Sequence, residues 1–173
     1  LRVARTIADL DGRETIARVA QLHQRTNQFS LTTRRFTEAD IESFMGRQER
    51  VRVLLGRASD KFGDHGIVAA AVATIDGGTA RIVSLLMSCR VIGRRIETAF
   101  LGALIGDLAA CQVERIQGIY LATPKNGMVR DLYAAKDYGR YALRGRNELP
   151  VNILYNTDTT GGNSGSPLLN AKG

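Results

Sequence analysis

A continuous run of small apolar residues, "IVAAAVATI" at 67–75, limits the fold more than any other stretch of the sequence. Because successive side chains of a strand point to opposite faces, a strand this apolar must be covered on both sides. The run is too short to cross a bilayer as a helix. The "DGG" at Asp76–Gly78 predicts a tight hairpin into a second apolar strand, residues 79–88. We therefore expect a sheet with a layer of structure on each face.

The remaining patterns place helices around this sheet. Thr37 followed three residues later by Asp40 has the spacing of a capping box and predicts the start of a short helix. Gly102 and Gly106 are expected to let a helix approach the sheet closely. Strands are predicted over 1–7, from 51, over 67–75, over 79–88 and from 115, and helices over 14–26, from 37, over 95–110 and from 126. This order predicts an α+β fold, a mixed sheet between helices, and not the repeated βαβ unit of a dinucleotide-binding domain.

Charge narrows the class of partner. The chain has 24 lysines and arginines against 17 acidic residues, a net charge of +7. Such a balance suits a nucleic acid, a phosphorylated cofactor or an acidic protein. The arginines are scattered and no aromatic residues alternate with them, which argues against nucleic acid. A solvated basic surface without a specific partner is the alternative interpretation.

The two cysteines, Cys89 and Cys111, form no CxxC pair and no cluster with histidine. We therefore expect neither a disulfide framework nor a metal site, as in a reducing compartment. The charged opening "LRVARTIADLDG" is not a secretory signal, and no apolar segment is long enough for a membrane span. These features predict a cytoplasmic domain, and the missing initiator methionine indicates that it was cut from a longer protein.

The stretch "SCRVIGRRIE" joins an apolar strand to a helical pattern. A helix N-terminus presents unpaired N–H groups and the positive end of its dipole. A glycine lets an anion approach the backbone, and arginines bind phosphate with a forked geometry. This turn therefore predicts a phosphate site made by Ser88, Arg90, Gly93, Arg94 and Arg95, with an ordinary connecting turn as the alternative.

The order of elements and this turn resemble the GNAT acyltransferases, which hold the pyrophosphate of coenzyme A with Arg/Gln-x-x-Gly-x-Gly/Ala. Here Arg90-x-x-Gly93-x-Arg95 takes that place, and Arg95 departs from the pattern. Asn126 and Leu132-Tyr133 resemble the later signature of the family. The resemblance implies a three-layer GNAT-like fold and a coenzyme A or phosphopantetheine thioester as substrate, contacted by Asn126. It also implies diverging strands near Ser88 and 119–122 that admit the pantetheine arm, and Tyr133 as general acid toward the leaving thiolate.

Four longer motifs narrow this likeness: "RVAQLHQRTNQFSLTTRRFTEADI", "DKFGDHGIV", "LMSCRVIGRRIE" and "YLATPKNGMVRDLY". Together, over residues 1–138, they resemble the C-terminal half of FkbH-family proteins, which make glyceryl-derived extender units for polyketides. In that family an N-terminal HAD-type half takes a phosphoglycerate donor, and the glyceryl group is delivered as a thioester on an acyl carrier protein. The resemblance implies an acyltransferase-like domain whose partners are a carrier protein and a HAD-type half outside this chain.

Cys89 is a second candidate for the chemistry. Neighbouring arginines and a helix N-terminus favour the thiolate, which could accept an acyl group. The alternative, a small buried residue at the end of a core strand, is the more common role of such a cysteine. His65 lies in a turn and is a candidate general base. Asn27, Arg34 and Arg35 are candidates for a donor or acceptor site, with a capped inter-helix loop as the alternative.

The other imidazole, His23, lies on the apolar face of a predicted helix and is expected to pack in the core. No acidic residue stands on the strand over 79–88, where many GNAT enzymes keep their base. This absence weakens the case for a free amine as acceptor. It keeps open a second function, that of a non-catalytic docking domain for a carrier protein.

The last segment, "LPVNILYNTDTTGGNSGSPLLNAKG", resembles the nucleophile segment of trypsin-like serine peptidases, most nearly of bacterial dipeptidyl-peptidases. Ser164 takes the place of the nucleophile, which needs a histidine base and a carboxylate. The two-barrel body that would supply them is not in the sequence, so we predict no peptidase activity. We assign 1–148 to the GNAT-like domain and 149–173 to a tail from a fused or misassembled reading frame, with chance likeness as the alternative. The tail is expected to complete a sheet edge or to pair with a neighbouring chain.

Overall fold

A single mixed sheet organises the protein. The computed structural model describes residues 2–4, 12–47, 49–61, 63–132 and 151–156. The six strands lie in chain order: β1 (Arg2–Ala4), β2 (Val51–Asp60), β3 (Gly63–Asp76), β4 (Thr79–Met87), β5 (Arg115–Leu121) and β6 (Val151–Asn156). The helices are α1 (Gly12–Arg25), α2 (Glu38–Met45) and α3 (Ile96–Ala110), with 3₁₀ turns η2 (Cys89–Val91) and η3 (Gly127–Val129). Strands β1 to β4 are antiparallel, whereas β4, β5 and β6 are parallel.

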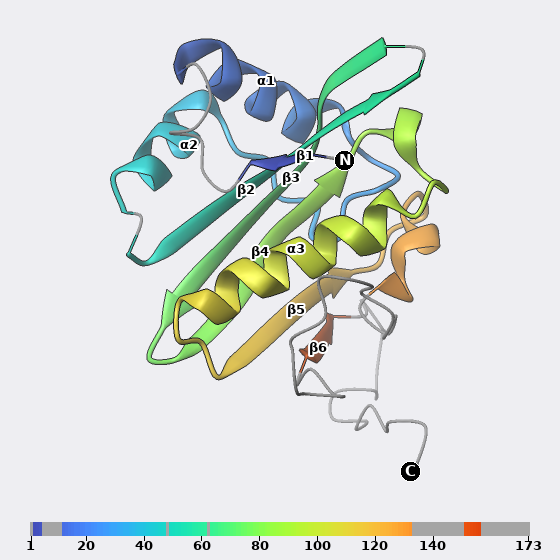
Figure 1. Ribbon diagram of the computed structural model, residues 1–173. Helices are drawn as coiled ribbons and strands as arrows, with labels where there is room; N and C mark the ends of the chain where they lie inside the picture. The colour runs from blue at the N-terminus through green and yellow to red at the C-terminus, as the bar shows by residue number, and fades with distance from the viewer. Residues whose placement is uncertain (1, 5–11, 48, 62, 133–150, 157–173) are drawn as a thin grey trace.

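The predicted α+β layering is confirmed. Residues 68–73 of β3 are completely buried, as a strand covered on both faces must be. Helices α1 and α2 cover one face of the sheet and α3 crosses the other (Figure 1). Two apolar cores follow from this arrangement. One holds Ile16, Val19 and Ile41 from α1 and α2, and the other holds Phe100 and Leu104 from α3.

Two local predictions are also confirmed. Gly77 and Gly78 both have positive φ, 50° and 77°, so the hairpin between β3 and β4 needs its glycines. At α2 the Thr37 hydroxyl accepts from the Asp40 N–H at 3.2 Å, and the Asp40 carboxylate accepts from the Thr37 N–H at 2.8 Å. The bond from the Thr37 N–H, and after it a bond of 2.8 Å from the Thr37 hydroxyl to the same carboxylate, hold the pKa of Asp40 below its usual value.

The structure corrects other predictions. The close approach of α3 to the sheet occurs at Gly56 of β2, where an added Cβ would lie 3.0 Å from the Ala69 Cβ and 3.1 Å from the Phe100 ring. An added Cβ at Gly106 would meet open space, so close packing is not the reason for that glycine. Of the helix predicted from residue 126, the described residues contain only η3, and the rest lies outside them.

The segment predicted as a tail contributes to the sheet. β6 pairs in parallel with β5 from Ile116↔Val151 to Leu121↔Asn156 and completes the edge, one of the two outcomes expected.

Replacing Gly56 by alanine should destabilise the protein by about 1–3 kcal/mol, because the new methyl group has no room between Ala69 and Phe100. The matched substitution Gly106→Ala, in the middle of α3, should raise stability by about 0.5–1 kcal/mol, since alanine is the better helix former. Urea unfolding of both variants measures the difference. Equal effects would contradict the packing described for Gly56.

Candidate functional site

The candidate site lies where β4 and β5 diverge. Their parallel pairing ends at Ile82↔Gly118, although β4 continues to Met87 and β5 to Leu121. Beyond this point the facing backbone groups of the two strands need other partners, since buried N–H and C=O groups are almost always hydrogen-bonded.

The connection between α1 and α2 supplies these partners. Ser30 forms an antiparallel bridge with Leu86. The Leu31 N–H donates to the Leu85 carbonyl at 3.1 Å, and the Met87 N–H donates to the Phe29 carbonyl at 3.0 Å. On the other side the Leu121 N–H donates to the Leu31 carbonyl at 2.7 Å. A short pseudo-strand, residues 29–32, thus lies between β4 and β5 and joins them.

The pseudo-strand is fully integrated into the core. Its four residues are all at most 3% exposed. The Thr32 hydroxyl donates to the Val83 carbonyl of β4 at 2.8 Å. In this structure residues 29–32 fill the space between the diverging strands, and entry of a pantetheine arm there stays a prediction.

Asn126 ties the pseudo-strand to the end of β5. Its amide nitrogen donates to the carbonyls of Ser30 and Leu121, each at 2.8 Å, and its amide oxygen accepts from the Thr123 N–H at 2.7 Å. Asn126 is completely buried. Asn126 therefore has a structural role, because both of its amide donors and its oxygen are used within the fold, and its contact with a cofactor stays a prediction.

The basic turn follows β4. Between β4 and α3 lie η2 and a turn in which Gly93 and Arg95 have positive φ, 79° and 61°. These are the two glycine-type positions of the motif noted in the sequence, so Arg95 adopts a backbone conformation that favours glycine. No described side chain caps the N-terminus of α3 at Arg95.

Two features of this turn differ from the expectation. The helix does not start directly after the strand, because residues 88–95 intervene. The amides are also not all open, since the Gly93 N–H donates to the Glu97 carboxylate at 2.5 Å. The turn thus already binds one carboxylate of its own chain at Gly93.

The charge of the turn acts on an arginine of α1. Burial, followed by the charges of Arg90 and Arg25, lowers the pKa of Arg18. Within the described residues none of these three arginines has an acidic partner at salt-bridge distance. No described ion pair therefore balances their positive charge.

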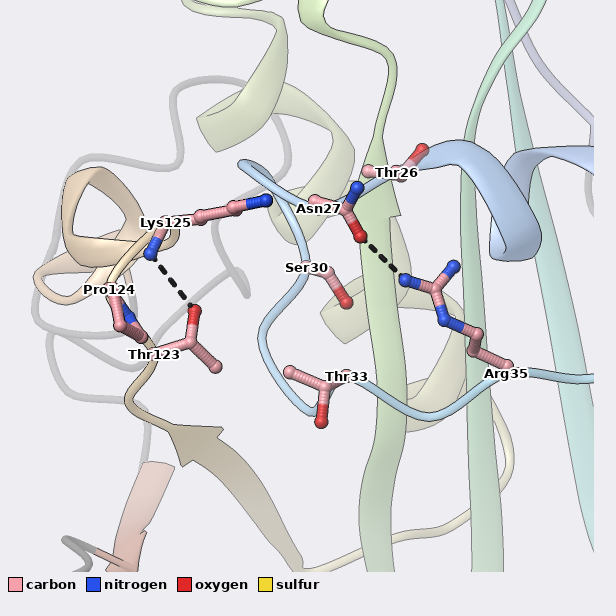
Figure 2. A pocket seen from close by; sticks show the side chains of 8 residues that line it. All are labelled: Thr26, Asn27, Ser30, Thr33, Arg35, Thr123, Pro124 and Lys125. Atoms are coloured by element: carbon pink, nitrogen blue, oxygen red, sulfur yellow. Dashed lines mark hydrogen bonds between the residues drawn. The ribbon is translucent and has the colours of Figure 1, made fainter.

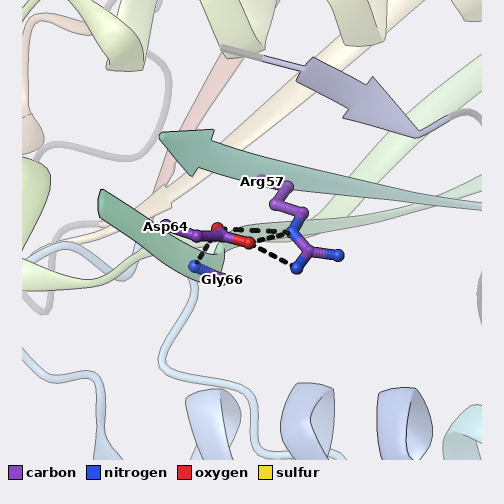
Figure 3. Close-up of polar contacts among 3 residues, drawn as sticks. All are labelled: Arg57, Asp64 and Gly66. Atoms are coloured by element: carbon purple, nitrogen blue, oxygen red, sulfur yellow. Dashed lines mark hydrogen bonds and ion pairs between the residues drawn. The ribbon is translucent and has the colours of Figure 1, made fainter. Parts of the chain in front are cut away.

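The hairpin between β2 and β3 adds a second charged group. His65 Nε2 lies 2.9 Å from Asp60 Oδ2, and the Arg94 guanidinium donates to the same oxygen at 3.2 Å. Beside them Arg57 binds Asp64, whose carboxylate also accepts from the Gly66 N–H at 2.8 Å (Figure 3). The structure therefore brings His65 and Arg94 together through Asp60.

The two predicted catalytic residues have different outcomes. Cys89 begins η2 and is exposed, so it does not fill the core, and its thiol is accessible. Tyr133 lies outside the described residues, as does Ser164. Ser88 is half-buried, and the Arg90 Nε–H lies 3.4 Å from its hydroxyl.

Of the remaining predicted residues, Asn27 and Arg35 line one pocket of about 220 Å³ (Figure 2). Arg34 is exposed, and no pocket described here includes its side chain. Its carbonyl is 3.3 Å from His23 Nδ1, which must donate. Burial lowers the pKa of His23 and outweighs the hydrogen bond to the Arg34 carbonyl, which alone would raise it. The His23 ring packs edge-on against Phe36. His23 is therefore a core residue, as predicted.

Sequence reasoning missed the pseudo-strand, the bond from Gly93 to Glu97, and the charge of Arg18. Asn126 was predicted from the sequence as a contact of the thioester substrate and not as a link between the pseudo-strand and β5. Of the missed features, only Glu97 could have been found from the local sequence, because a carboxylate in the first turn of a helix favours bonds to nearby N–H groups.

Over the described residues, no three His, Cys, Asp or Glu side chains are grouped as a metal site would require. None of the described helices could span a membrane.

The fold is that of the GNAT acyltransferases, as predicted. The crystal structure of the ribosomal-protein-S18-alanine N-acetyltransferase from Escherichia coli matches with a TM-score of 0.53 at 15% sequence identity. The match covers 77% of this chain and 74% of that one. At this level of identity the likeness establishes the fold alone.

The C-terminal part is similar to a different class of protein. The family model "Peptidase S46" matches residues 124–173, a range that includes Asn126 and Tyr133. The Asp/Glu-specific dipeptidyl-peptidase of Porphyromonas endodontalis is 52% identical over 54 residues, and dipeptidyl-peptidase 7 of Phocaeicola vulgatus is 51% identical over 45 residues. These matches cover 31% and 26% of this chain, which spans only 7% and 6% of those proteins.

Asn126→Ala should lower the free energy of unfolding by about 2–4 kcal/mol, because two buried carbonyls and one N–H lose their partner. The control, Asn27→Ala, removes the same amide group from an exposed position and should change the free energy of unfolding by roughly 0.5 kcal/mol or less. Urea unfolding of both variants is the measurement. A mild effect at Asn126 would show that the pseudo-strand does not depend on it.

Stability should fall on acidification between about pH 7.5 and about pH 5.5. Since the pKa of His23 is lower in the folded state than in the unfolded chain, the unfolded chain binds the extra proton first. Urea unfolding across this range should show the loss in the wild type and in His65→Gln. His23→Gln should flatten the profile, and an unchanged slope in that variant would contradict the role of His23.

Proposed function

We propose that the GNAT-like part of the chain binds an acyl thioester of phosphopantetheine, on coenzyme A or on an acyl carrier protein, and transfers the acyl group. The observation that carries the proposal is the basic turn between β4 and α3, with left-handed Gly93 and Arg95 ahead of an uncapped helix. In this chain the turn follows β4, which diverges from β5 after Ile82↔Gly118.

The charge around the turn supports phosphate as the ligand. Like charges gathered without acidic partners repel one another, and a bound anion removes that repulsion. Besides burial, which is the larger cause, the charge of Arg90 in this turn lowers the pKa of Arg18, so positive charges do repel one another here. Guanidinium forks donate two parallel hydrogen bonds to phosphate oxygens, and the dipole of α3 adds a favourable field.

Glu97 shows both what one amide of the turn can bind and what a phosphate would have to displace. Its carboxylate accepts from the Gly93 N–H, so this amide is oriented to bind a negatively charged oxygen. A phosphate bound at Gly93 would compete with Glu97 for this N–H and would lower the affinity by the cost of that exchange.

The chemistry assigned to the site rests on the resemblances. An acceptor adds to the thioester carbonyl, the C–S bond breaks, and the pantetheine thiolate takes a proton, for which Tyr133 is the candidate donor. Alternatively, the exposed Cys89 thiolate accepts the acyl group as a new thioester, and the pantetheine thiol leaves with the proton. His65, paired with Asp60, is the candidate base.

The finer identity of the reaction is part of this proposal. The FkbH-like motifs support a glyceryl group, delivered in the cytoplasm to an acyl carrier protein, with a HAD-type domain as donor. The net charge of +7 would suit an acidic carrier protein.

A second candidate function is a docking domain that binds the carrier protein without chemistry. The pseudo-strand favours it, since residues 29–32 occupy the space between β4 and β5. The described β4 also has no carboxylate. Transfer assays of Cys89→Ala and Tyr133→Phe together with a HAD-type half separate the two functions, because a docking domain would leave turnover unchanged in both variants.

Coenzyme A at a hundredfold excess over its dissociation constant should stabilise the full chain by about 3 kcal/mol in thermal unfolding. Pantetheine without phosphate should stabilise it much less, because the basic turn would have no ligand. Arg90→Ala and Arg94→Ala should each weaken coenzyme A binding about tenfold or more, the value of a charged hydrogen bond.

Arg115→Ala is the matched control, since it removes the same charge from an exposed position at the start of β5, far along the strand from the turn. If Arg115→Ala weakened coenzyme A binding equally, the effect would come from the overall charge of the protein and not from the basic turn. No stabilisation by coenzyme A would contradict the proposal for that cofactor, and carrier-protein binding would then be measured directly.

A further inference from the structure

A pocket separate from the basic turn lies between the α1–α2 connection and the turn after β5. Its volume is about 220 Å³, below the roughly 300–1,000 Å³ of pockets for drug-sized ligands. Thr26, Asn27, Thr33 and Arg35 line it from one side, and Thr123 and Lys125 from the other. It shares no residue with the turn over 88–95.

Arg35 is held in place before any ligand binds. One of its terminal nitrogens donates to the His23 carbonyl at 2.6 Å and also to the Gln24 carbonyl, and the other donates to the Asn27 side-chain oxygen at 2.5 Å. All three partners are neutral, so they orient the guanidinium but do not cancel its charge. Its Nε–H and one terminal N–H are not used by these bonds.

Lys125 adds a second cation from the opposite wall. Figure 2 shows its side chain extending from the turn after β5 toward Asn27, with Arg35 beyond. Lys125 is exposed, and no described carboxylate lies within salt-bridge distance of either cation. The lining residues include no acid.

The residues between the two cations limit the rest of the ligand. Threonine offers both a methyl group and a hydroxyl, and Pro124 adds an apolar ring. Such walls suit a short aliphatic or hydroxylated body of a few carbon atoms. They leave no room for a nucleotide, given the volume of the pocket.

We propose that this pocket binds a small organic anion, whose carboxylate or phosphate head lies between Arg35 and Lys125 and whose short carbon body contacts the threonines. Both kinds of head accept hydrogen bonds from a guanidinium fork and a lysine ammonium. The pocket shares no residue with the basic turn, so each of the two proposals can be tested by itself.

The test uses NMR titration of the full chain with lactate, propionate and inorganic phosphate, each against sodium chloride at equal ionic strength. Backbone amide signals of Thr33, Thr123 and Lys125 should shift with a saturating curve. Saturation by lactate and propionate assigns a carboxylate ligand, and saturation by phosphate alone assigns a phosphate ester.

Lys125→Gln should weaken this binding about tenfold, the loss of one charged hydrogen bond. Arg130→Gln, an equal charge change at an exposed position that does not line the pocket, should leave it unchanged. Coenzyme A binding should be the same in both variants, so failure here is distinguishable from failure of the thioester site. Signals that respond equally to chloride, or equal affinities in Lys125→Gln and the wild type, would overturn the proposal.

Discussion

The early end of the β4–β5 pairing is the constraint on which the rest of the structure depends. After Ile82↔Gly118 the two strands separate, and their buried backbone groups must find hydrogen-bond partners elsewhere. The pseudo-strand over 29–32 provides them on both sides. Asn126 then locks the pseudo-strand to β5 with a saturated, fully buried amide. Both the candidate thioester site and the pocket beside it are built around this one arrangement.

This arrangement sets a condition for the proposed function. An extended thioester arm between β4 and β5 would need the same backbone groups of Leu85, Met87 and Leu121 that the pseudo-strand uses. Arm and pseudo-strand would then exclude each other, and the apparent affinity for a thioester would be reduced by the cost of moving residues 29–32. The basic turn is not subject to this competition, because its exposed arginines lie beyond the end of β4. The cost of moving residues 29–32 therefore falls on entry of the arm and not on recognition of the phosphate.

Features determined by neighbouring residues could be predicted from the sequence, and features determined by distant ones could not. The hairpin at Gly77–Gly78 and the cap at Thr37 depend on a few adjacent residues, and both were predicted. The layered fold followed from the apolar run over 67–75, since its composition alone requires cover on both faces. The structural role of Asn126 could not be predicted because its partner Ser30 is 96 residues away. The close approach at Gly56 depends on Phe100 of α3, so no local pattern marks it.

The strand order also has a consequence for synthesis of the chain. Because the six strands lie side by side in the order in which they are made, each new strand can add to the edge formed just before it. The pseudo-strand is the exception. It leaves the ribosome before β2 exists, whereas its partners in β4 and β5 and at Asn126 follow tens of residues later. During that interval Phe29 and Leu31 have no core to enter, and a chaperone that binds short apolar segments would find its target there.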